Sequence, residues 1–389
     1  MRGAMDAPLS EPPVFTVDGN RLTPLVSGPA RLEALVALIN GAERSLRLLY
    51  YIYAADAAGR RVRDALAAAC ARGVAVTLIV DGFGSDPALD DRFFDQLRQA
   101  GARVCLFLPR FGRRYLLRNH QKLALADEAR VIVGGFNIED SYFGDPDQGA
   151  WRDLGLLVDG PAATRLAGYF DALARWTDRP RATLRSLRRE LRQWSEPDGK
   201  ARWLLGGPSR RLSPWARIMK RDMAGARAIA FVSGYFAPSP AMLRRLKRAA
   251  RNGRVRLVAP AQSDTSIVIN AARFTYAGLL REGVEIFEYQ RTKLHTKLYV
   301  IDDVVHLGSA NFDMRSLYLN LELMLRIDDS AFAAHARHYI AGEIADAERI
   351  TRDLHRARMT PWRRVVQAGA WFVITVIDPS LTKRLSWPD

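Results

Sequence analysis

The chain has 389 residues, of which 48% are hydrophobic and 26% are charged, a balance typical of globular proteins and not of disordered ones. Its net charge of +16 points to a polyanionic partner, such as nucleic acid, an anionic membrane surface or a phosphate-bearing substrate. The two cysteines, Cys70 and Cys105, exclude a disulfide framework and fit a reducing compartment. No apolar run reaches the roughly eighteen residues of a membrane-spanning helix.

The predicted elements follow one another in the same order twice. The first half opens with an apolar helix face made by Leu32, Leu35, Val36 and Ile39, at the spacing of an amphipathic helix. It continues with a strand at 45–53, a helix at 61–73, a strand at 74–82, a helix at 90–101 and a strand at 102–109. The second half has a strand at 228–236, a helix at 240–253, a strand at 255–260, a helix at 270–283 and a strand at 284–290.

Four of these helices end at a glycine, which predicts a left-handed helix stop at Gly73, Gly101, Gly253 and Gly283. Alternating strands and helices predict a duplicated α/β fold with mostly parallel strands and helices on both faces of each sheet. The domain boundaries that we expect are an N-terminal extension at 1–20, a first domain at 21–178, a basic linker at 179–203, a second domain at 204–350 and a basic, aromatic C-terminal segment at 351–389.

One motif occurs at the equivalent point of each half. Residues 118–137 read RNHQKLALADEARVIVGGFN and residues 293–311 read KLHTKLYVIDDVVHLGSAN, so both contain His-x-Lys, four residues, Asp, and then Gly-x-x-Asn. Only seven of the 58 basic residues are lysines, and two of them stand in these motifs. One copy alone is a weak signal, but two copies in an internal repeat are a strong one.

The residue types of the motif suit chemistry on a phosphate diester. In an extended strand, residues i and i+2 project from the same face, so His120 lies beside Lys122 and His295 lies beside Lys297. Each lysine neutralises the phosphate as a point charge, which needs no metal ion. One imidazole can attack phosphorus while the other protonates the departing oxygen.

Further polar residues are expected around this site. The amides of Asn137 and Asn311 can donate hydrogen bonds to phosphate oxygens. Each imidazole needs a carboxylate on its second nitrogen to fix its tautomer. Asp153 and Glu322 are candidates for this role, because each is an acidic residue in an otherwise apolar strand, where an unpaired carboxylate is unfavourable.

The repeated motif resembles that of the phospholipase D superfamily, over roughly residues 20 to 350. Six stretches are similar to those of bacterial cardiolipin synthases that lack N-terminal membrane spans: VDGFGS, RNHQKLALAD, VGGFNIEDSYFG, PAQSD, AGLLREGVEIFEY and GSANFDMRSLYLNLE. The resemblance implies two α/β/α sandwich domains related by a pseudo-twofold axis, with the active site at their interface. It also implies a reaction that needs no cofactor or metal and proceeds through a phosphohistidine.

Carried over by resemblance, His120 attacks phosphatidylglycerol, and His295 protonates the departing glycerol and then deprotonates a second phosphatidylglycerol. Asp127 and Asp302 complete the catalytic motif, and we expect them to be structural ion-pair partners within it. The chain departs from the family pattern at Gly135, where many first motifs have serine. The second motif also has one residue fewer between its Asp and its Gly, and His306 in this tighter turn is expected at the surface.

The C-terminal segment combines arginines with aromatic residues. Arg356, Arg358, Arg363 and Arg364 precede an apolar stretch that contains Trp371 and Phe372, and Trp387 lies near the end. This composition suits a membrane interface with anionic lipid. A terminal helix packed on the core is an equally weighted alternative.

We therefore predict a cardiolipin synthase that acts as a monomer at the cytoplasmic face of a bacterial inner membrane, with phosphatidylglycerol and the membrane surface as its partners. The alternative is a phospholipase D-type hydrolase, in which water replaces the second phosphatidylglycerol. A nuclease is the weaker form of that alternative, and the basic charge leaves nucleic acid open as a partner.

Overall fold

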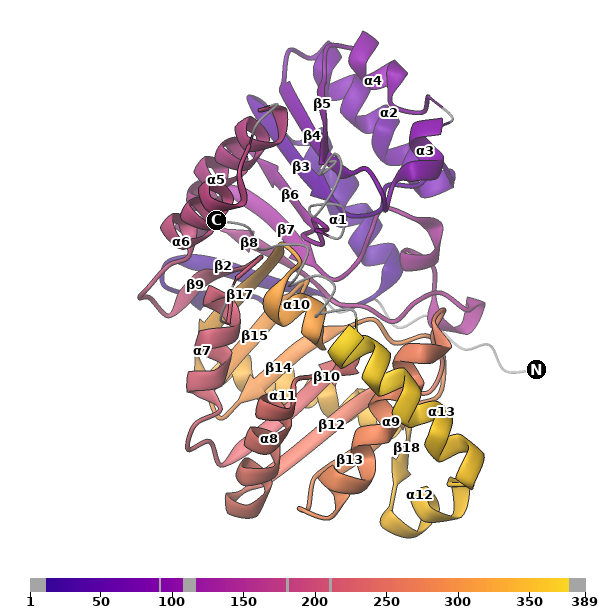
Figure 1. The fold of residues 1–389 in the computed structure, drawn as a ribbon. Coiled ribbons are helices and arrows are strands. Elements are labelled where there is room, and N and C mark those ends of the chain that lie inside the picture. Colours follow the sequence, from indigo (N-terminus) through magenta and orange to yellow (C-terminus); the bar gives the residue numbers. More distant parts are fainter. Residues whose placement is uncertain (1–11, 91, 108–116, 180–181, 210–211, 378–389) are drawn as a thin grey trace, which may run out of the picture.

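The computed structural model describes residues 12–90, 92–107, 117–179, 182–209 and 212–377. Two halves are stacked on each other, and each is built on an eight-stranded sheet. Figure 1 shows the first half above the second, with helices on the outer sides of both.

The first half contains β1 to β8 and α1 to α6. Its strands are β1 Phe15–Val17, β2 Asn20–Leu25, β3 Ser45–Tyr50, β4 Ala75–Asp81, β5 Arg103–Phe107, β6 Leu123–Ala126, β7 Arg130–Gly134 and β8 Gly155–Asp159. Its helices are α1 Gly28–Asn40, α2 Ala57–Ala71, α3 Asp86–Asp90, α4 Asp95–Gln99, α5 Pro161–Asp178 and α6 Leu184–Trp194.

The second half contains β9 to β18 and α7 to α13. Its strands are β9 Ala201–Gly206, β10 Ala228–Ser233, β11 Phe236–Ala237, β12 Arg254–Pro260, β13 Glu285–Tyr289, β14 Lys297–Ile301, β15 Val304–Gly308, β16 Phe312–Asp313, β17 Glu322–Asp328 and β18 Ala347–Ile350. Its helices are α7 Pro214–Asp222, α8 Pro240–Asn252, α9 Ser266–Leu280, α10 Met314–Tyr318, α11 Ser330–Ala345, α12 Arg352–Arg358 and α13 Pro361–Phe372.

The two sheets have one topology, which confirms the predicted duplication. The order β2-β8-β7-β6-β3-β4-β5 in the first sheet matches β9-β17-β15-β14-β10-β12-β13 in the second, with β1 and β18 added at opposite edges. The prediction of mostly parallel strands was wrong. Within the two large sheets of the described residues, only β3-β4-β5 and β10-β12-β13 pair in parallel, and the other neighbours are antiparallel. The separate pair of β11 and β16 is parallel. The motif strands return through tight hairpins, and hairpins force antiparallel pairing.

A shared hydrophobic core joins the two halves. It runs from the inward faces of both sheets to α5 and α11, and includes Leu123 and Phe170 from the first half with Leu298 and Ile340 from the second. Two further cores lie on the outer faces of the sheets, one in each half. Since the central core is continuous across the boundary, the halves are fixed relative to each other, as a site at their interface requires.

Three details differ from the sequence-based expectations. The predicted N-terminal extension and linker each contribute a sheet edge, because β1 lies before residue 20 and β9 begins at Ala201. The helix expected at 90–101 is limited to α4, and the short helix α3 ends where the expected helix begins. Gly73, Gly101 and Gly283 have positive φ, but Gly253 is extended (φ −170°), and a Cβ there would lie 2.0 Å from the carbonyl oxygen of Arg227.

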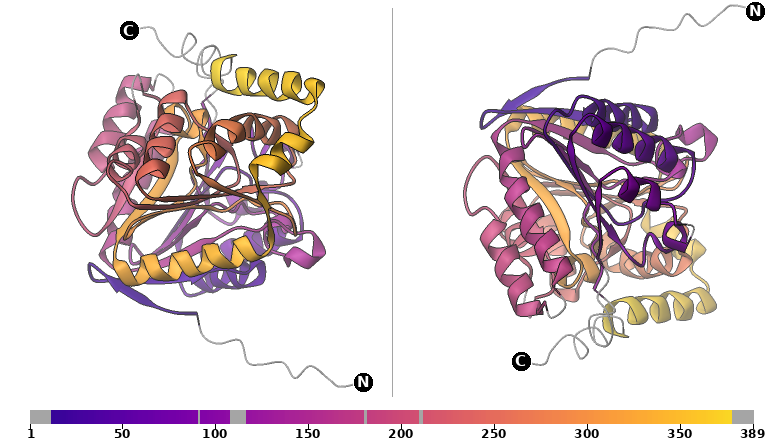
Figure 2. Two further views of the ribbon diagram at one scale, coloured as in Figure 1. Left: turned by 90° about the horizontal axis from the view of Figure 1, so that it is seen from below. Right: turned by 90° about the horizontal axis from the view of Figure 1, so that it is seen from above.

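The C-terminal segment folds as α12 and α13, and α13 packs across α9 on the outside of the second half (Figure 2). Ala370 of α13 is buried against Ala271 of α9, and the Trp371 ring contacts the Phe274 ring at 5.2 Å. Among the described residues, no helix is both long and apolar enough to cross a membrane. Trp387 lies outside the described residues.

Candidate active site

Each motif histidine stands just before a strand and is anchored to the opposite half through its backbone. The His120 N–H donates to the Leu321 carbonyl oxygen at 2.9 Å, and the His295 N–H donates to the Arg152 carbonyl oxygen at 2.8 Å. Asn119 and Leu321 form a parallel bridge, as do Leu294 and Arg152. The site is therefore assembled by pairing of residues from the two halves at their boundary.

The carboxylate that holds each histidine also comes from the opposite half. His120 Nδ1 lies 3.1 Å from both oxygens of Glu322, and His295 Nδ1 lies 2.7 Å from Oδ2 of Asp153. Both carboxylates are fully buried. A carboxylate at Nδ1 fixes the proton on that nitrogen and leaves Nε2 of each ring for chemistry.

The two carboxylates are fixed by different contacts. Glu322 accepts hydrogen bonds from the hydroxyls of Ser309 at 2.5 Å and Ser316 at 2.8 Å. Asp153 accepts one from the Leu154 backbone N–H at 2.7 Å. At the position equivalent to Ser309 stands Gly135, where a Cβ would lie 2.6 Å from Oδ1 of Asp153 and 2.9 Å from the Lys297 side chain. Gly135 therefore gives Asp153 and Lys297 the space that they occupy.

The two motif lysines are buried and share one electrostatic environment. Burial lowers the pKa of Lys122 to about 7 and that of Lys297 to about 8, while Glu322 and Asp153 both act in the opposite direction on each lysine. Lys122 Nζ donates to the His120 carbonyl oxygen at 2.7 Å, and Lys297 Nζ donates to that of His295. Burial removes the water that would otherwise solvate the two ammonium groups. The negative charge of a bound phosphate would compensate for this loss and stabilise the charged form of both lysines.

Burial favours the neutral form of both histidines. Burial lowers the pKa of His120, although Glu322 counteracts it. Burial, followed by Lys297, lowers the pKa of His295 to about 3. The His120 side chain is 12% exposed and that of His295 is 5% exposed. The His295 ring is enclosed by Tyr142 and Trp151, each with its ring centroid at 5.2 Å.

The two asparagines are buried and occupy equivalent positions. The side-chain oxygen of Asn137 accepts from the Ile52 backbone N–H, and that of Asn311 accepts from the Tyr235 backbone N–H, each at 3.2 Å. The Asn137 amide nitrogen also donates to the Tyr142 hydroxyl at 3.0 Å. These bonds fix both amides just beyond the ends of β3 and β10, and their contact with phosphate stays a prediction.

The motif aspartates lie away from the histidines, which fits the structural role expected for them, but their partners are backbone N–H groups and not the basic side chains of ion pairs. Asp127 and Asp302 lie in the hairpins at the far ends of β6 and β14 from the histidines. The Asp127 carboxylate accepts from the backbone N–H groups of residues 43, 44 and 45, and the Asp302 carboxylate accepts from those of residues 227 and 228. They fix the chain that enters β3 and β10.

His306 is not at the surface, contrary to our expectation. The turn is one residue tighter, as predicted, but it consists of residues 302 and 303, and His306 lies within β15. Its side chain is fully buried, and its Nε2 lies 2.9 Å from Oδ2 of Asp222. Asp222 also pairs with Arg326, so the carboxylate compensates for two buried basic groups.

Sequence reasoning missed Arg31, which fixes the backbone at Asp153. Its guanidinium is buried and donates to the backbone oxygens of Asp153 at 2.6 Å and Tyr142 at 2.7 Å. The available signal was its spacing, because Arg31 lies four residues before Leu35 on the buried face of α1. Ser309, which follows β15, and Ser316, which lies in α10, were also missed, since a single serine has no distinctive sequence pattern.

Known proteins match this chain over both halves. Residues 35–174 and 220–343 match a family model described as "Cardiolipin synthase, PLD-like domain", where PLD denotes phospholipase D. The chain belongs to this family. A cardiolipin synthase of Geobacillus thermodenitrificans is 34% identical over 310 residues, which cover 77% of this chain and 61% of the relative. This chain therefore spans less than two thirds of the Geobacillus protein.

Two more proteins extend the comparison. Cardiolipin synthase A of Pseudomonas fluorescens is 32% identical over 346 residues, which cover 87% of this chain and 71% of the relative. The crystal structure of a phosphatidylserine synthase from Haemophilus influenzae superposes with a TM-score of 0.71 and 14% identity, over 97% of each chain. At that identity the superposition establishes the shared fold, which agrees with the family membership and with the predicted duplicated fold.

Proposed function

We propose that this protein transfers a phosphatidyl group from one phosphatidylglycerol to another, which yields cardiolipin and releases glycerol. The observation that carries the proposal is the pair of histidines, each held at Nδ1 by a carboxylate of the opposite half, with a buried lysine beside each. The cardiolipin synthases among the relatives supply the substrate class.

In the first step, Nε2 of His120 attacks phosphorus and forms a P–N bond, while the bond from phosphorus to the glycerol oxygen breaks. The departing oxygen takes a proton from Nε2 of His295. In the second step, a hydroxyl of the second phosphatidylglycerol gives its proton to His295 and attacks phosphorus. The P–N bond then breaks and His120 returns to its neutral form. Lys122 and Lys297 hold the phosphate oxygens, with Asn137 and Asn311 as further donors.

The role of His295 sets a condition on substrate binding. With a pKa of about 3, the ring is neutral at neutral pH, so its Nε2 carries no proton to give until substrate binds. A bound phosphate diester adds a negative charge beside the ring and offsets the repulsion from Lys297, so it raises the pKa of His295. We therefore expect the acid to be charged only once substrate is bound.

The lipid substrate places the protein at a membrane, and the basic charge of +16 favours an anionic one. The exposed hydrophobic side chains of α13 support attachment at the membrane interface. We propose a peripheral position on the cytoplasmic face of a bacterial inner membrane. Both motifs lie in one chain, so a monomer suffices for the reaction.

The test is to incubate the purified protein with phosphatidylglycerol vesicles and to identify the products by mass spectrometry. We expect cardiolipin and glycerol in equal amounts. Phosphatidic acid as the sole lipid product would mean that water is the acceptor and that the protein is a hydrolase. Cleavage of plasmid DNA without any lipid product would support the nuclease alternative instead.

A further inference from the structure

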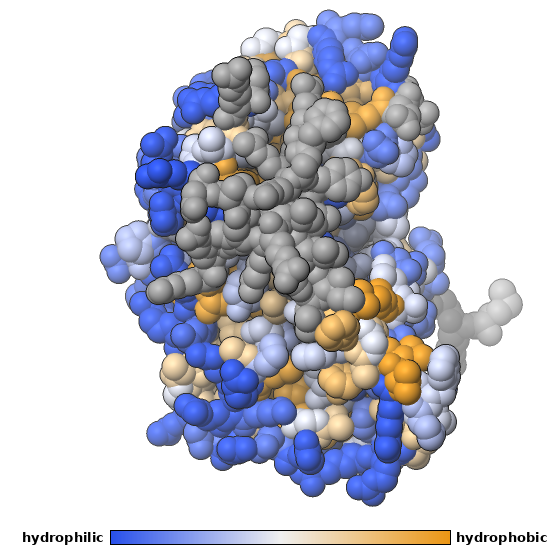
Figure 3. Space-filling model, viewed as in Figure 1, coloured by the Kyte–Doolittle hydropathy of each residue, from blue (hydrophilic) through white to orange (hydrophobic). Residues whose placement is uncertain are grey.

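Helix α13 leaves a row of large hydrophobic side chains exposed although it is packed on α9. Trp362 is 73% exposed, Val365 62% and Phe372 51%, and Phe274 of α9 is exposed beside them. Figure 3 shows hydrophobic side chains over α13 on this face, bordered by hydrophilic ones. Large exposed apolar groups that gather on one face usually mark an interaction site.

Beside this row lies a groove of about 590 Å³ between α9 and the α12–α13 pair. The apolar residues of its lining, here called the floor, are Phe274, Ala277, Leu280, Met359 and Ala368, of which Phe274 and Ala277 are exposed to solvent. Its rim is cationic and is formed by Arg281, Arg352, Arg356 and Arg364, and no carboxylate is among the lining residues. Among the described residues, Arg281, Arg352 and Arg364 have no carboxylate partner in ion-pair range.

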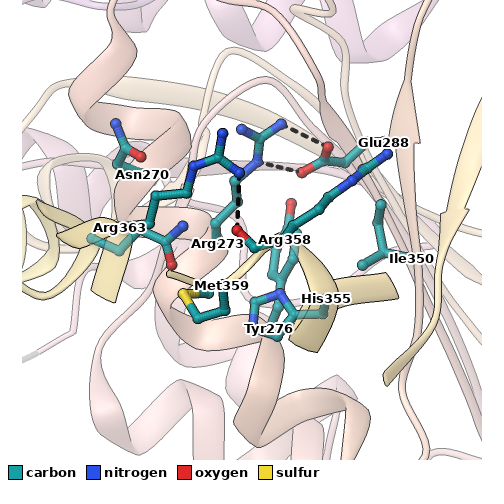
Figure 4. A pocket seen from close by; sticks show the side chains of 10 residues that line it. Asn270, Arg273, Tyr276, Glu288, Ile350, His355, Arg358, Met359 and Arg363 are labelled. Carbon is teal, nitrogen blue, oxygen red and sulfur yellow. Dashed lines mark hydrogen bonds and ion pairs between the residues drawn. The ribbon is translucent and has the colours of Figure 1, made fainter. Parts of the chain in front are cut away.

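A second pocket on the other side of Met359 has a different charge balance. Figure 4 shows that Arg273 is paired there with Glu288 and that Arg363 donates to the Arg358 backbone oxygen. Arg358 itself pairs with Glu348. The charges of Arg273 and Arg358 in this pocket are thus already compensated. On the groove rim Arg356 pairs with Asp353 at 3.5 Å, whereas Arg281, Arg352 and Arg364 have no carboxylate partner among the described residues.

We propose that the groove binds one anionic phospholipid of the membrane, separately from the active site. One acyl chain lies along the apolar floor, and the phosphate lies among the rim arginines, chiefly Arg281 and Arg364. The proposal rests on the proposed function for the membrane position. It goes further than adsorption of α13 to the membrane interface, because it assigns a specific binding site for one lipid to the groove beside the C-terminal helices.

Charge complementarity and shape favour this occupant. An acyl chain needs an elongated apolar surface, and an anionic head group needs guanidinium donors at one end of it. The groove supplies both elements, because Phe274 and Ala277 lie on α9 at helical spacing from Arg281, the residue that caps the end of this helix. Arg352 donates to the backbone oxygens of Leu280 and Arg281, which fixes it over the end of α9.

The test measures binding of the full chain to vesicles that are then sedimented. One set of vesicles contains phosphatidylcholine with about 30% phosphatidylglycerol, a moderate anionic content, and the other contains phosphatidylcholine alone. The rim variant is Arg281→Gln with Arg364→Gln. Its charge-matched control is Arg244→Gln with Arg248→Gln on α8, two exposed arginines outside the groove. The floor variant is Ala277→Gln, which changes no charge, and Ala277→Ser is its control.

We expect about tenfold weaker binding to the anionic vesicles for the rim variant and a loss within about twofold for the α8 control. Ala277→Gln weakens binding about fivefold and Ala277→Ser does not. Arg281→Lys with Arg364→Lys restores most of the binding, which separates charge from misfolding.

Equal losses for the two arginine pairs would overturn the proposal, because they would indicate unspecific attraction by net charge. Unchanged binding of Ala277→Gln would mean that no chain enters the groove. A smaller particle mass of Ala277→Gln in solution would assign the groove to a second copy of the protein. None of these results depends on turnover. The proposed reaction can therefore be disproved while the groove assignment stands, and the groove assignment can be disproved while the proposed reaction stands.

Discussion

The half of the site around His120 and the half around His295 have the same arrangement of histidine, lysine and carboxylate, but the residues that surround each histidine differ. Glu322 reaches His120 and is held by two serine hydroxyls, whereas Asp153 reaches His295 with a shorter side chain and has a glycine in place of the first serine. His295 is also enclosed by two aromatic rings and has the pKa of about 3.

This difference suits a division of roles. His120 is the more open ring, and burial favours its neutral form, which an attacking nitrogen needs. His295 lies in the more enclosed position, where we expect its Nε2 to hold a proton only when the phosphate charge is present beside it. A duplicated fold thus provides two similar imidazoles, and the surroundings of each determine which reaction step it serves.

The two carboxylates offer the strongest test of the division. We expect Asp153→Asn to reduce turnover about 10³-fold or more, because the amide no longer stabilises the protonated His295 ring. Glu322→Gln should reduce it about 10²-fold, because the amide still orients His120 but stabilises the positively charged phosphohistidine ring less well, and the phosphate bonded to that ring offsets part of this loss. Steady-state rates on phosphatidylglycerol vesicles measure both, and equal losses would contradict the division.

The buried lysines predict that anion binding depends on pH. Lys122 and Lys297 titrate near 7 and 8 in the empty site, and a bound anion raises both pKa values, so binding takes up protons. The affinity for sulfate, which does not itself titrate in this range, should fall about tenfold or more between pH 7 and pH 9.

Calorimetry in two buffers of different ionisation enthalpy measures this proton uptake directly. Lys122→Met should remove about half of it, while Lys247→Met on α8 should change nothing. An affinity that stays constant from pH 7 to pH 9 would mean that the lysines are fully charged in the empty site.

The exchange of Gly135 for serine tests whether the glycine–aspartate pair at His295 can be replaced by the serine–glutamate pair found at His120. Gly135→Ser should reduce kcat/KM about fivefold, because the new Cβ takes the space of the Asp153 carboxylate. The double variant with Asp153→Glu copies the Ser309–Glu322 arrangement and should be less impaired than the product of the two single effects. Purely multiplicative losses would show that the serine and the longer acid are unrelated.

The motif aspartates should affect stability and not chemistry. Asp127→Ala removes an acceptor of three backbone N–H groups and should lower the free energy of unfolding by about 1–2 kcal/mol, with a smaller loss for Asp302→Ala. Urea unfolding measures both. A tenfold lower kcat in a protein that remains folded would return Asp127 to the catalytic set.

Much of this site follows from local patterns. The repeat of elements predicted the duplication, and residue types in the two motifs predicted His120, Lys122, His295 and Lys297 as a group. Asp153 and Glu322 were predicted because buried carboxylates need partners. Which histidine each acid holds did not follow, since this depends on how the two halves pair across the interface.

Other features depend on the whole fold. The parallel order was overestimated, because the alternation of helices and strands covers only three strands of each sheet. His306 was misplaced because its partner Asp222 is distant in sequence and compensates for its burial. Arg31 was missed because a buried arginine that donates to backbone oxygens resembles a surface residue in its sequence pattern.

The central claim is that one site contains both histidines and that His120 forms the covalent bond. A phosphatidyl ester of p-nitrophenol tests it, because this leaving group departs without a proton. We predict that His295→Asn releases a burst of one equivalent of nitrophenol and carries the phosphatidyl group on residue 120, as located by mass spectrometry, whereas His120→Asn releases none. A burst from His120→Asn, with the phosphatidyl group on residue 295, would contradict the account.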